Sequence, residues 1–151
     1  MAQKSKTAQD RIYTIGYEGW ELDDFIAHLT EAGVQHVADV RARPGSHKKG
    51  FSKTPLGAAL AAAGIEYSNW RELGTSPETR QAYHETGDAK AFFAAYAKEL
   101  AQHKDRLAEL ADLAREQPVA LLCFESDAAP CHRSACAAEL AKQTGAEVVD
   151  L

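Results

Sequence analysis

The chain has 151 residues, of which 45% are hydrophobic and 26% are charged. These are ordinary values for a globular domain, so they exclude a chain that is disordered throughout. The length suits one domain with its own core and is too short for two. A formal net charge of −5 argues against a surface coated with basic patches for DNA, although a local basic site stays compatible with it.

The first ten residues do not contain the apolar core that is expected of a signal peptide. Residues 1–10 are polar, and no stretch is apolar for long enough to cross a bilayer. Three cysteines without a secretory signal are typical of reduced thiols in the cytoplasm. We therefore expect a cytoplasmic protein without a membrane partner, with a disordered tail over residues 1–10 and a single domain over residues 11–151.

Short apolar segments alternate with segments of helical periodicity along the chain. The expected strands cover residues 11–15, 36–40, 65–68, 119–124 and 147–150. The expected helices cover residues 22–33, 54–64 with Thr54 as the cap, 77–87, 88–116 with a break near His103, and 131–144. This order predicts a three-layer αβα fold, in which a mainly parallel five-stranded sheet has helices on both faces.

Chemically distinctive residues follow four of these expected strands. In parallel sheets, ligands bind beyond the carboxyl ends of the strands, so loops that follow different strands meet at one edge. The loops in question are residues 16–19, 41–53, 70–72 and 125–134. The sequence therefore predicts one site at this edge, where Gly16 and Gly19 serve a tight turn.

The second of these loops, residues 41–53, has five Lys and Arg side chains and no acidic one. Arg41 and Arg43 directly follow a strand, and guanidinium groups held rigidly in this way suit phosphate or carboxylate recognition. The alternative for them is a salt bridge to Asp39 or Glu125. The predicted anion-binding residues are Arg41, Arg43, Ser46, His132, Arg133 and Ser134.

Cys131 stands where a helix is expected to begin, and free backbone amides at such a position stabilise a thiolate. It is a candidate nucleophile, with the alternative that it is simply a small residue at a helix start. Cys123, inside an apolar strand, is expected to be a packed thiol, and a Cys123–Cys131 disulfide is unattractive in the cytoplasm. Asp39 and Glu125 end strands, where a carboxylate acts as a general base or orients an arginine. The candidate catalytic residues are Cys131, Asp39 and Glu125.

Two aromatic residues, Tyr17 and Trp70, are candidate stacking faces for a base, with core packing as the alternative. The spacing of His132 and Cys136 permits a metal pair, but no Cys-x-x-Cys or His-Glu-x-x-His pattern supports one, so no metal is predicted. The chain also lacks a Walker loop, a Gly-x-Gly-x-x-Gly fingerprint and the Cys-to-Arg spacing of cysteine phosphatases. No cofactor is predicted.

Several short motifs occur together in a specific order. They are Thr14-Ile15-Gly16-Tyr17, Asp39-Val40-Arg41, Arg43-Pro44-Gly45-Ser46, Phe51-Ser52-Lys53, Leu73-Gly74, Leu121-Leu122-Cys123 and Cys131-His132-Arg133. In this order they resemble the domain-of-unknown-function family numbered 488 (DUF488), over residues 11–150. The resemblance implies a single-domain three-layer α/β fold with its site at residues 39–41 and 131–133, and it supplies no reaction. This chain departs from the family in having Tyr17 and Glu18 where many relatives show a His-Ser-like pair.

The leading hypothesis is a protein that binds a small anionic ligand such as a nucleotide, and that acts as an enzyme on a phosphate-bearing small molecule. Whether turnover occurs stays open. One alternative is a nucleic-acid-binding module that uses residues 41–53, which the acidic overall charge disfavours. The other is a thiol-based redox or metal protein that uses Cys123, Cys131 and Cys136.

Overall fold

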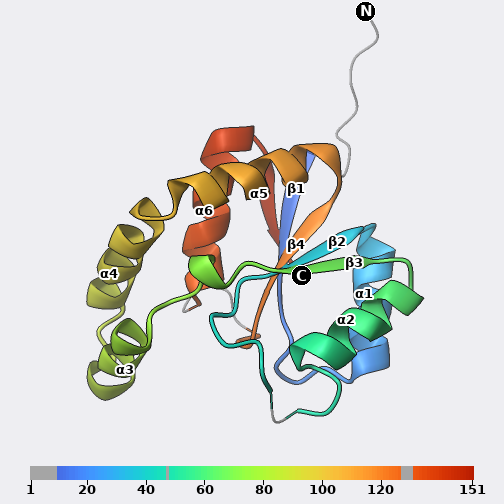
Figure 1. Cartoon of the computed structure of the whole chain (residues 1–151), viewed down its shortest axis with the longest axis horizontal. Helices are drawn as coiled ribbons and strands as arrows, with labels where there is room; N and C mark the ends of the chain where they lie inside the picture. Colours follow the sequence, from blue (N-terminus) through green and yellow to red (C-terminus); the bar gives the residue numbers. More distant parts are fainter. Residues whose placement is uncertain (1–9, 47, 127–130) are drawn as a thin grey trace, which may run out of the picture.

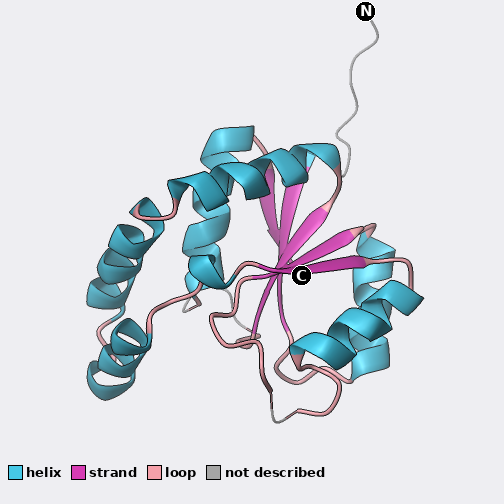
Figure 2. Ribbon diagram, in the orientation of Figure 1, coloured by secondary structure: helices cyan, strands magenta, loops and turns pink. Residues whose placement is uncertain are grey.

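A computed structural model describes residues 10–46, 48–126 and 131–151 of the chain. Within these residues, five strands form one sheet in the order β3-β2-β4-β1-β5, and every pairing in it is parallel. The strands fan out around the centre of the molecule (Figure 2). They are β1 (Arg11–Gly16), β2 (His36–Asp39), β3 (Glu66–Asn69), β4 (Val119–Cys123) and β5 (Glu147–Asp150).

Six α-helices surround this sheet in the described part of the chain (Figure 1). The expected break near His103 is confirmed, because one helix ends at Ala101 and the next begins at Lys104. A short 3-10 helix (Arg71–Leu73) was not expected. The helices are α1 (Leu22–Ala32), α2 (Lys53–Ala62), α3 (Pro77–Thr86), α4 (Ala89–Ala101), α5 (Lys104–Glu116) and α6 (His132–Thr144).

The core lies in two layers, one on each face of the sheet. Phe25 of α1 and Leu60 of α2 pack on one face, and Leu110 of α5 and Leu140 of α6 pack on the other. The central strand β4 serves both layers, since alternate residues along a strand point to opposite faces and all five of its residues are buried. The expected three-layer α/β fold is therefore confirmed.

The start of α2 differs from the expected one. Helix α2 begins at Lys53 after Ser52, rather than after Thr54. The Ser52 hydroxyl does not cap this helix, because it hydrogen-bonds the backbone of Ser46 instead.

The tail expected over residues 1–10 lies, apart from Asp10, outside the described residues. Among the described helices, none has the length and apolarity that a membrane span requires.

The end of β1 approaches the segment after β4 so closely that only glycine fits. A Cβ on Gly16 would lie 1.6 Å from the carbonyl oxygen of Glu125 and 2.9 Å from Nη1 of Arg133. The expected turn is made by Gly19, whose φ of +83° favours glycine. Gly16 is therefore required for close packing of two backbones rather than for a turn.

We expect Gly16→Ala to lower the free energy of unfolding by about 1–3 kcal/mol, because the added methyl group forces the backbone at Glu125 to move. Urea-induced unfolding followed by circular dichroism measures this loss. Gly45→Ala is the matched control, since a Cβ at Gly45 meets nothing within 4 Å. Equal stability of the two variants would contradict the assigned role of Gly16.

Candidate functional site

A cleft of about 240 Å³ opens at the carboxyl edge of the sheet. Segments that are distant in the sequence meet there, as the parallel topology requires: the ends of β1, β2 and β4, the start of α6, and helices α3 and α4. The lining residues are Tyr17, Arg41, Arg43, Gly45, Thr75, Arg80, Tyr83, Phe92, Cys123, Phe124, Glu125 and His132.

Arg41, which lines the cleft, forms a buried ion pair with Asp39. Nε and Nη2 of Arg41 donate to the two carboxylate oxygens of Asp39 at 2.8 and 2.7 Å, and Nη1 donates to the carbonyl of Phe51 at 2.8 Å. The hydroxyl of Tyr67 also donates to Asp39, and burial together with this hydrogen bond raises the pKa of Tyr67. Asp39 is fully buried, so its carboxylate orients Arg41, as the alternative interpretation held, and has no access to a ligand as a base.

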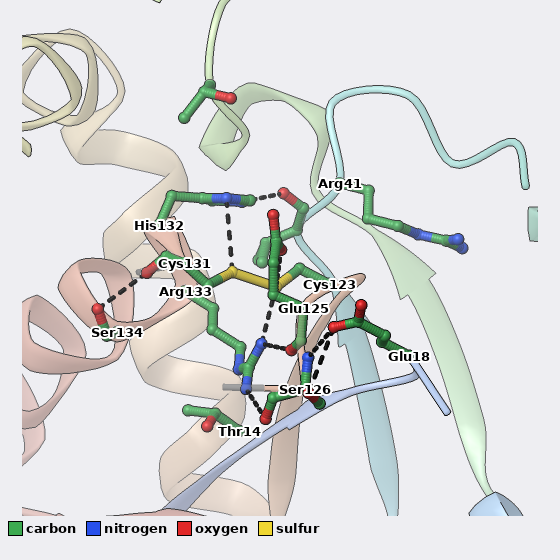
Figure 3. Close-up of a disulfide and its surroundings, with 12 residues drawn as sticks. Thr14, Glu18, Arg41, Cys123, Glu125, Ser126, Cys131, His132, Arg133 and Ser134 are labelled. Carbon is green, nitrogen blue, oxygen red and sulfur yellow. Dashed lines mark hydrogen bonds between the residues drawn. A yellow bond between two sulfur atoms is a disulfide. The ribbon is translucent and has the colours of Figure 1, made fainter. Parts of the chain in front are cut away.

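The sulfur atoms of Cys123 and Cys131 are joined in a disulfide at the floor of this region (Figure 3). The expectation that these two cysteines are reduced thiols, and that a disulfide between them is unattractive, was therefore wrong for this pair. The physical reason is topological, because the end of β4 and the start of α6 meet at the same edge of the sheet. Cys136 is a free thiol, and burial raises its pKa to about 12.

Arg133 is a fully buried residue rather than a side chain on the cleft surface. Its Nη1 donates to Sγ of Cys123 at 3.0 Å and to the carbonyl of Glu125, and its Nη2 donates to the carbonyl of Ser126 at 3.3 Å. A buried guanidinium requires such acceptors, since an uncompensated charge is costly in the interior. Arg133 therefore positions the segment after β4 and its cysteine.

His132 lies beside the other cysteine of the pair. Its Nε2 is 2.8 Å from the carbonyl oxygen of Val40, and its Nδ1 is 3.9 Å from Sγ of Cys131 (Figure 3). A carbonyl accepts only, so Nε2 carries the proton and Nδ1 presents a lone pair toward the sulfur. Burial lowers the pKa of His132, despite the hydrogen bond to Val40, and keeps the ring neutral.

Cys131 and Ser134 organise the first turn of α6. Cys131 is the residue that precedes the helix, as expected, and the hydroxyl of Ser134 donates to its carbonyl at 2.9 Å. Ser46 is similarly engaged, because its hydroxyl accepts from the Tyr17 hydroxyl at 2.9 Å. The hydroxyl groups of both serines, which were predicted to bind an anion, therefore form hydrogen bonds within the protein.

Neither predicted stacking residue presents a free ring to the cleft. Tyr17 is buried, and its ring stacks on Phe51 with the centroids 4.8 Å apart. Trp70 belongs to the core beneath α5, where the guanidinium of Arg106 lies 4.1 Å from its ring centroid. The core alternative therefore describes both residues. Glu18, in the same loop as Tyr17, accepts from the backbone and hydroxyl of Ser126 and so steadies the segment after β4.

Two exposed arginines, Arg43 and Arg80, complete the cleft. Arg43 follows β2 as expected, and Arg80 comes from α3. Helix α3 has no buried residue of its own, and it is held by Glu99 of α4, which accepts from the backbone of Ser76 at 2.7 Å. Sequence reasoning missed Arg80 because this arginine follows no strand, and no local pattern shows where α3 lies.

The sulfurs of Cys123 and Cys131 and a carboxylate oxygen of Glu125 lie within 4.8 Å of one another. Two thiolates and a carboxylate are a donor set that suits Zn²⁺. In this structure, however, the two sulfurs are bonded to each other, so the described arrangement is a disulfide with a neighbouring carboxylate.

A family model described as "Domain of unknown function DUF488" matches residues 21–140. The chain belongs to this family. The DUF488 match covers the Asp39–Arg41 and Cys131–Arg133 segments, whereas Tyr17 and Glu18 precede the matched residues. Comparisons with the curated proteins and with the solved structures found no match.

The neutral state of His132 predicts a pH dependence of stability for this DUF488 protein. Because burial lowers its pKa from 6.5, the unfolded chain takes up a proton below about pH 6.5 that the folded chain excludes. The free energy of unfolding therefore falls as the pH is lowered from about 7.5 to about 5.5, by up to about 1.4 kcal/mol for this histidine. His36, whose pKa burial also lowers, adds to the fall.

Urea titrations at the two pH values measure this dependence. We expect a smaller fall for His132→Gln, which cannot titrate, and an unchanged fall for the control His84→Gln, which alters an exposed side chain on α3. The same fall in both variants would show that His132 is not kept neutral by the fold.

Proposed function

We propose that this DUF488 protein binds a small anionic molecule, bearing a phosphate or a carboxylate, through Arg43 and Arg80. The observation that carries the proposal is that these two exposed arginines, from different segments, line one cleft. Within the described residues, neither forms an ion pair with an acidic side chain, and the side chain of Arg80 makes one hydrogen bond, from Nη2 to the hydroxyl of Thr75 at 3.4 Å. Guanidinium groups with free donors are well suited to phosphate and carboxylate oxygens.

The size and the aromatic lining of the cleft narrow the class of ligand. A volume of about 240 Å³ lies just below the range of roughly 300–1,000 Å³ that is usual for small-molecule sites. The stacked rings of Tyr83 and Phe92 and the ring of Phe124, which is 47% exposed, offer apolar surface beside the arginines. A compact anion with one apolar or ring-bearing part, such as a mononucleotide, fits this description.

A sulfur atom and a carboxylate face the same cleft. Cys123 and Glu125 line it together with the two arginines, so a ligand bound there lies against a sulfur atom and a carboxylate. We therefore propose that the protein also reacts with the bound anion. Arg43 and Arg80 would bind it, and Cys123, Cys131 and Glu125 are the candidate reacting groups.

The contacts of the basic segment disfavour the nucleic-acid alternative. In the segment 41–53, Arg41 is neutralised by Asp39, and Nζ of Lys48 lies 3.5 Å from the carbonyl of Tyr17 and 5.4 Å from the ring centroid of Phe51. Fewer cations are left to contact a phosphate backbone than the sequence alone indicated. Binding of this kind falls steeply with salt, which separates it from binding of a single anion.

Isothermal titration with inorganic phosphate and with AMP tests the proposal. We expect the double variant Arg43→Ala/Arg80→Ala to raise the Kd for both at least tenfold, because each charge-assisted hydrogen bond contributes about 1.5–3 kcal/mol. The matched control is Lys90→Ala/Lys98→Ala, which also removes two exposed charges but from α4, away from the cleft lining. Equal weakening in both double variants, or no binding of either probe to the unaltered protein, would refute anion recognition at this cleft.

A further inference from the structure

We propose that Cys123 and Cys131 act as a dithiol–disulfide couple that reduces small disulfides bearing carboxylate groups. The exchange chemistry rests on the cysteine pair and its neighbours. The preference for an anionic disulfide rests, in addition, on the proposed function of Arg43 and Arg80.

The cleft-facing sulfur, that of Cys123, is surrounded by groups that generate and stabilise a thiolate. Nη1 of Arg133 lies 3.0 Å from this sulfur, and a neighbouring guanidinium favours the anionic form. Oε2 of Glu125 lies 3.4 Å from the same sulfur, so in the reduced protein the thiol can donate its proton to that carboxylate. A sulfur that served only as a core atom would need neither group.

The second sulfur, that of Cys131, has a different pair of supporting groups. Cys131 precedes the first turn of α6, where the free amides and the helix dipole stabilise a thiolate. Nδ1 of His132 is 3.9 Å from its sulfur and carries a lone pair, because Nε2 is engaged with Val40. His132 is thus placed to accept the proton of the Cys131 thiol.

The third cysteine of the chain provides a contrast within the same fold. Cys136 lies on α6 and is fully buried, and no cationic group among the described residues hydrogen-bonds its sulfur. Burial keeps Cys136 in the thiol form, and buried cysteines of this kind are inert. The neighbouring cation, carboxylate and imidazole are therefore specific to Cys123 and Cys131.

Access to the pair determines which sulfur reacts first and with what. Each of the two cysteines is only 1% exposed, and Cys123, not Cys131, lines the cleft. A disulfide within a folded protein is too large to enter a cleft of about 240 Å³, whereas one end of a small disulfide can reach the floor. Carboxylates on that small disulfide would lie beside Arg43 and Arg80.

The reaction balances in two exchange steps. In the first, the Cys123 thiol gives its proton to Glu125, and the thiolate attacks one sulfur of the small disulfide R–S–S–R. A Cys123–S–S–R bond forms, the original S–S bond breaks, and the first thiol R–SH leaves with the proton from Glu125. In the second, Cys131 gives its proton to His132 Nδ1 and attacks Cys123 Sγ, which releases the second thiol with that proton. The small disulfide gains two electrons, and the two protein thiols lose them.

Single-turnover kinetics on the full chain test this proposal. Reduced protein is mixed with glutathione disulfide, which carries carboxylates, or with uncharged hydroxyethyl disulfide, and the released thiol is quantified by chromatography. We expect two thiols released per protein from either probe. We expect Cys123→Ser to release none, and Cys131→Ser to release one and to retain a mixed disulfide. Cys136→Ser serves as the control with the unaltered rate.

The preference of the protein for anionic over neutral disulfides is measured by comparing the rates of thiol release from the two probes. We expect Arg43→Ala/Arg80→Ala to lower the rate with glutathione disulfide about tenfold and to lower the rate with hydroxyethyl disulfide less, and Lys90→Ala/Lys98→Ala to change neither. Release of two thiols with the same loss for both probes would overturn the anion preference and leave the exchange chemistry standing. Failure to release thiol from either probe, or stoichiometric zinc on the reduced protein that Cys123→Ser abolishes, would overturn the couple itself.

Discussion

The candidate site depends on the hydrogen bonds that the buried guanidinium of Arg133 donates. A charge in the interior must be met by acceptors, and here they are the carbonyls of Glu125 and Ser126 and the sulfur of Cys123. The segment after β4 is thereby held against the end of β1, where Gly16 leaves room for it. The sulfur of Cys123 consequently meets that of Cys131 at the start of α6.

A division of roles among the arginines follows from their burial. Arg41 and Arg133 are enclosed and hold the framework, the first through Asp39 and the carbonyl of Phe51 and the second through the segment after β4. Arg43 and Arg80 are exposed at the same cleft. A fixed framework with free cations at its surface matches what binding of a small ligand requires, because the cost of ordering the site is met during folding.

The fold could be predicted from the sequence because its signals are local. The apolar segment of β4, the proline after Ser76 and the glycines that end helices each specify their own element, and their alternation specifies a parallel sheet. That topology in turn predicted that the loops after β1, β2, β3 and β4 meet. Residues from the first, second and fourth of these loops line the cleft, whereas residues 70–72, which follow β3, do not. The positions of Cys131 before α6 and of Arg43 after β2 were predicted in this way.

The roles of individual side chains could not be predicted because they depend on tertiary distances. Nothing in the order of residues shows that Arg133 is enclosed while Arg43 is exposed, or that Trp70 is covered by Arg106. Arg80 reaches the cleft because α3 packs against α4, through Glu99 and through the stacked rings of Tyr83 and Phe92, and these contacts join positions that are distant in the chain. The disulfide was likewise judged unattractive because a reducing environment was expected, since the sequence does not show the distance between the two cysteines.

The pairing of the cysteines is the claim that can be tested most directly, by mass spectrometry of the protein after oxidation, alkylation and digestion with trypsin. Cleavage after Arg115 and Arg133 places Cys123 and Cys131 on one peptide and Cys136 on the next. The account predicts that the first peptide is unalkylated and lighter than its reduced form by two hydrogens, while Cys136 is alkylated. Alkylation of both Cys123 and Cys131, or a bridge from either of them to Cys136, would contradict it.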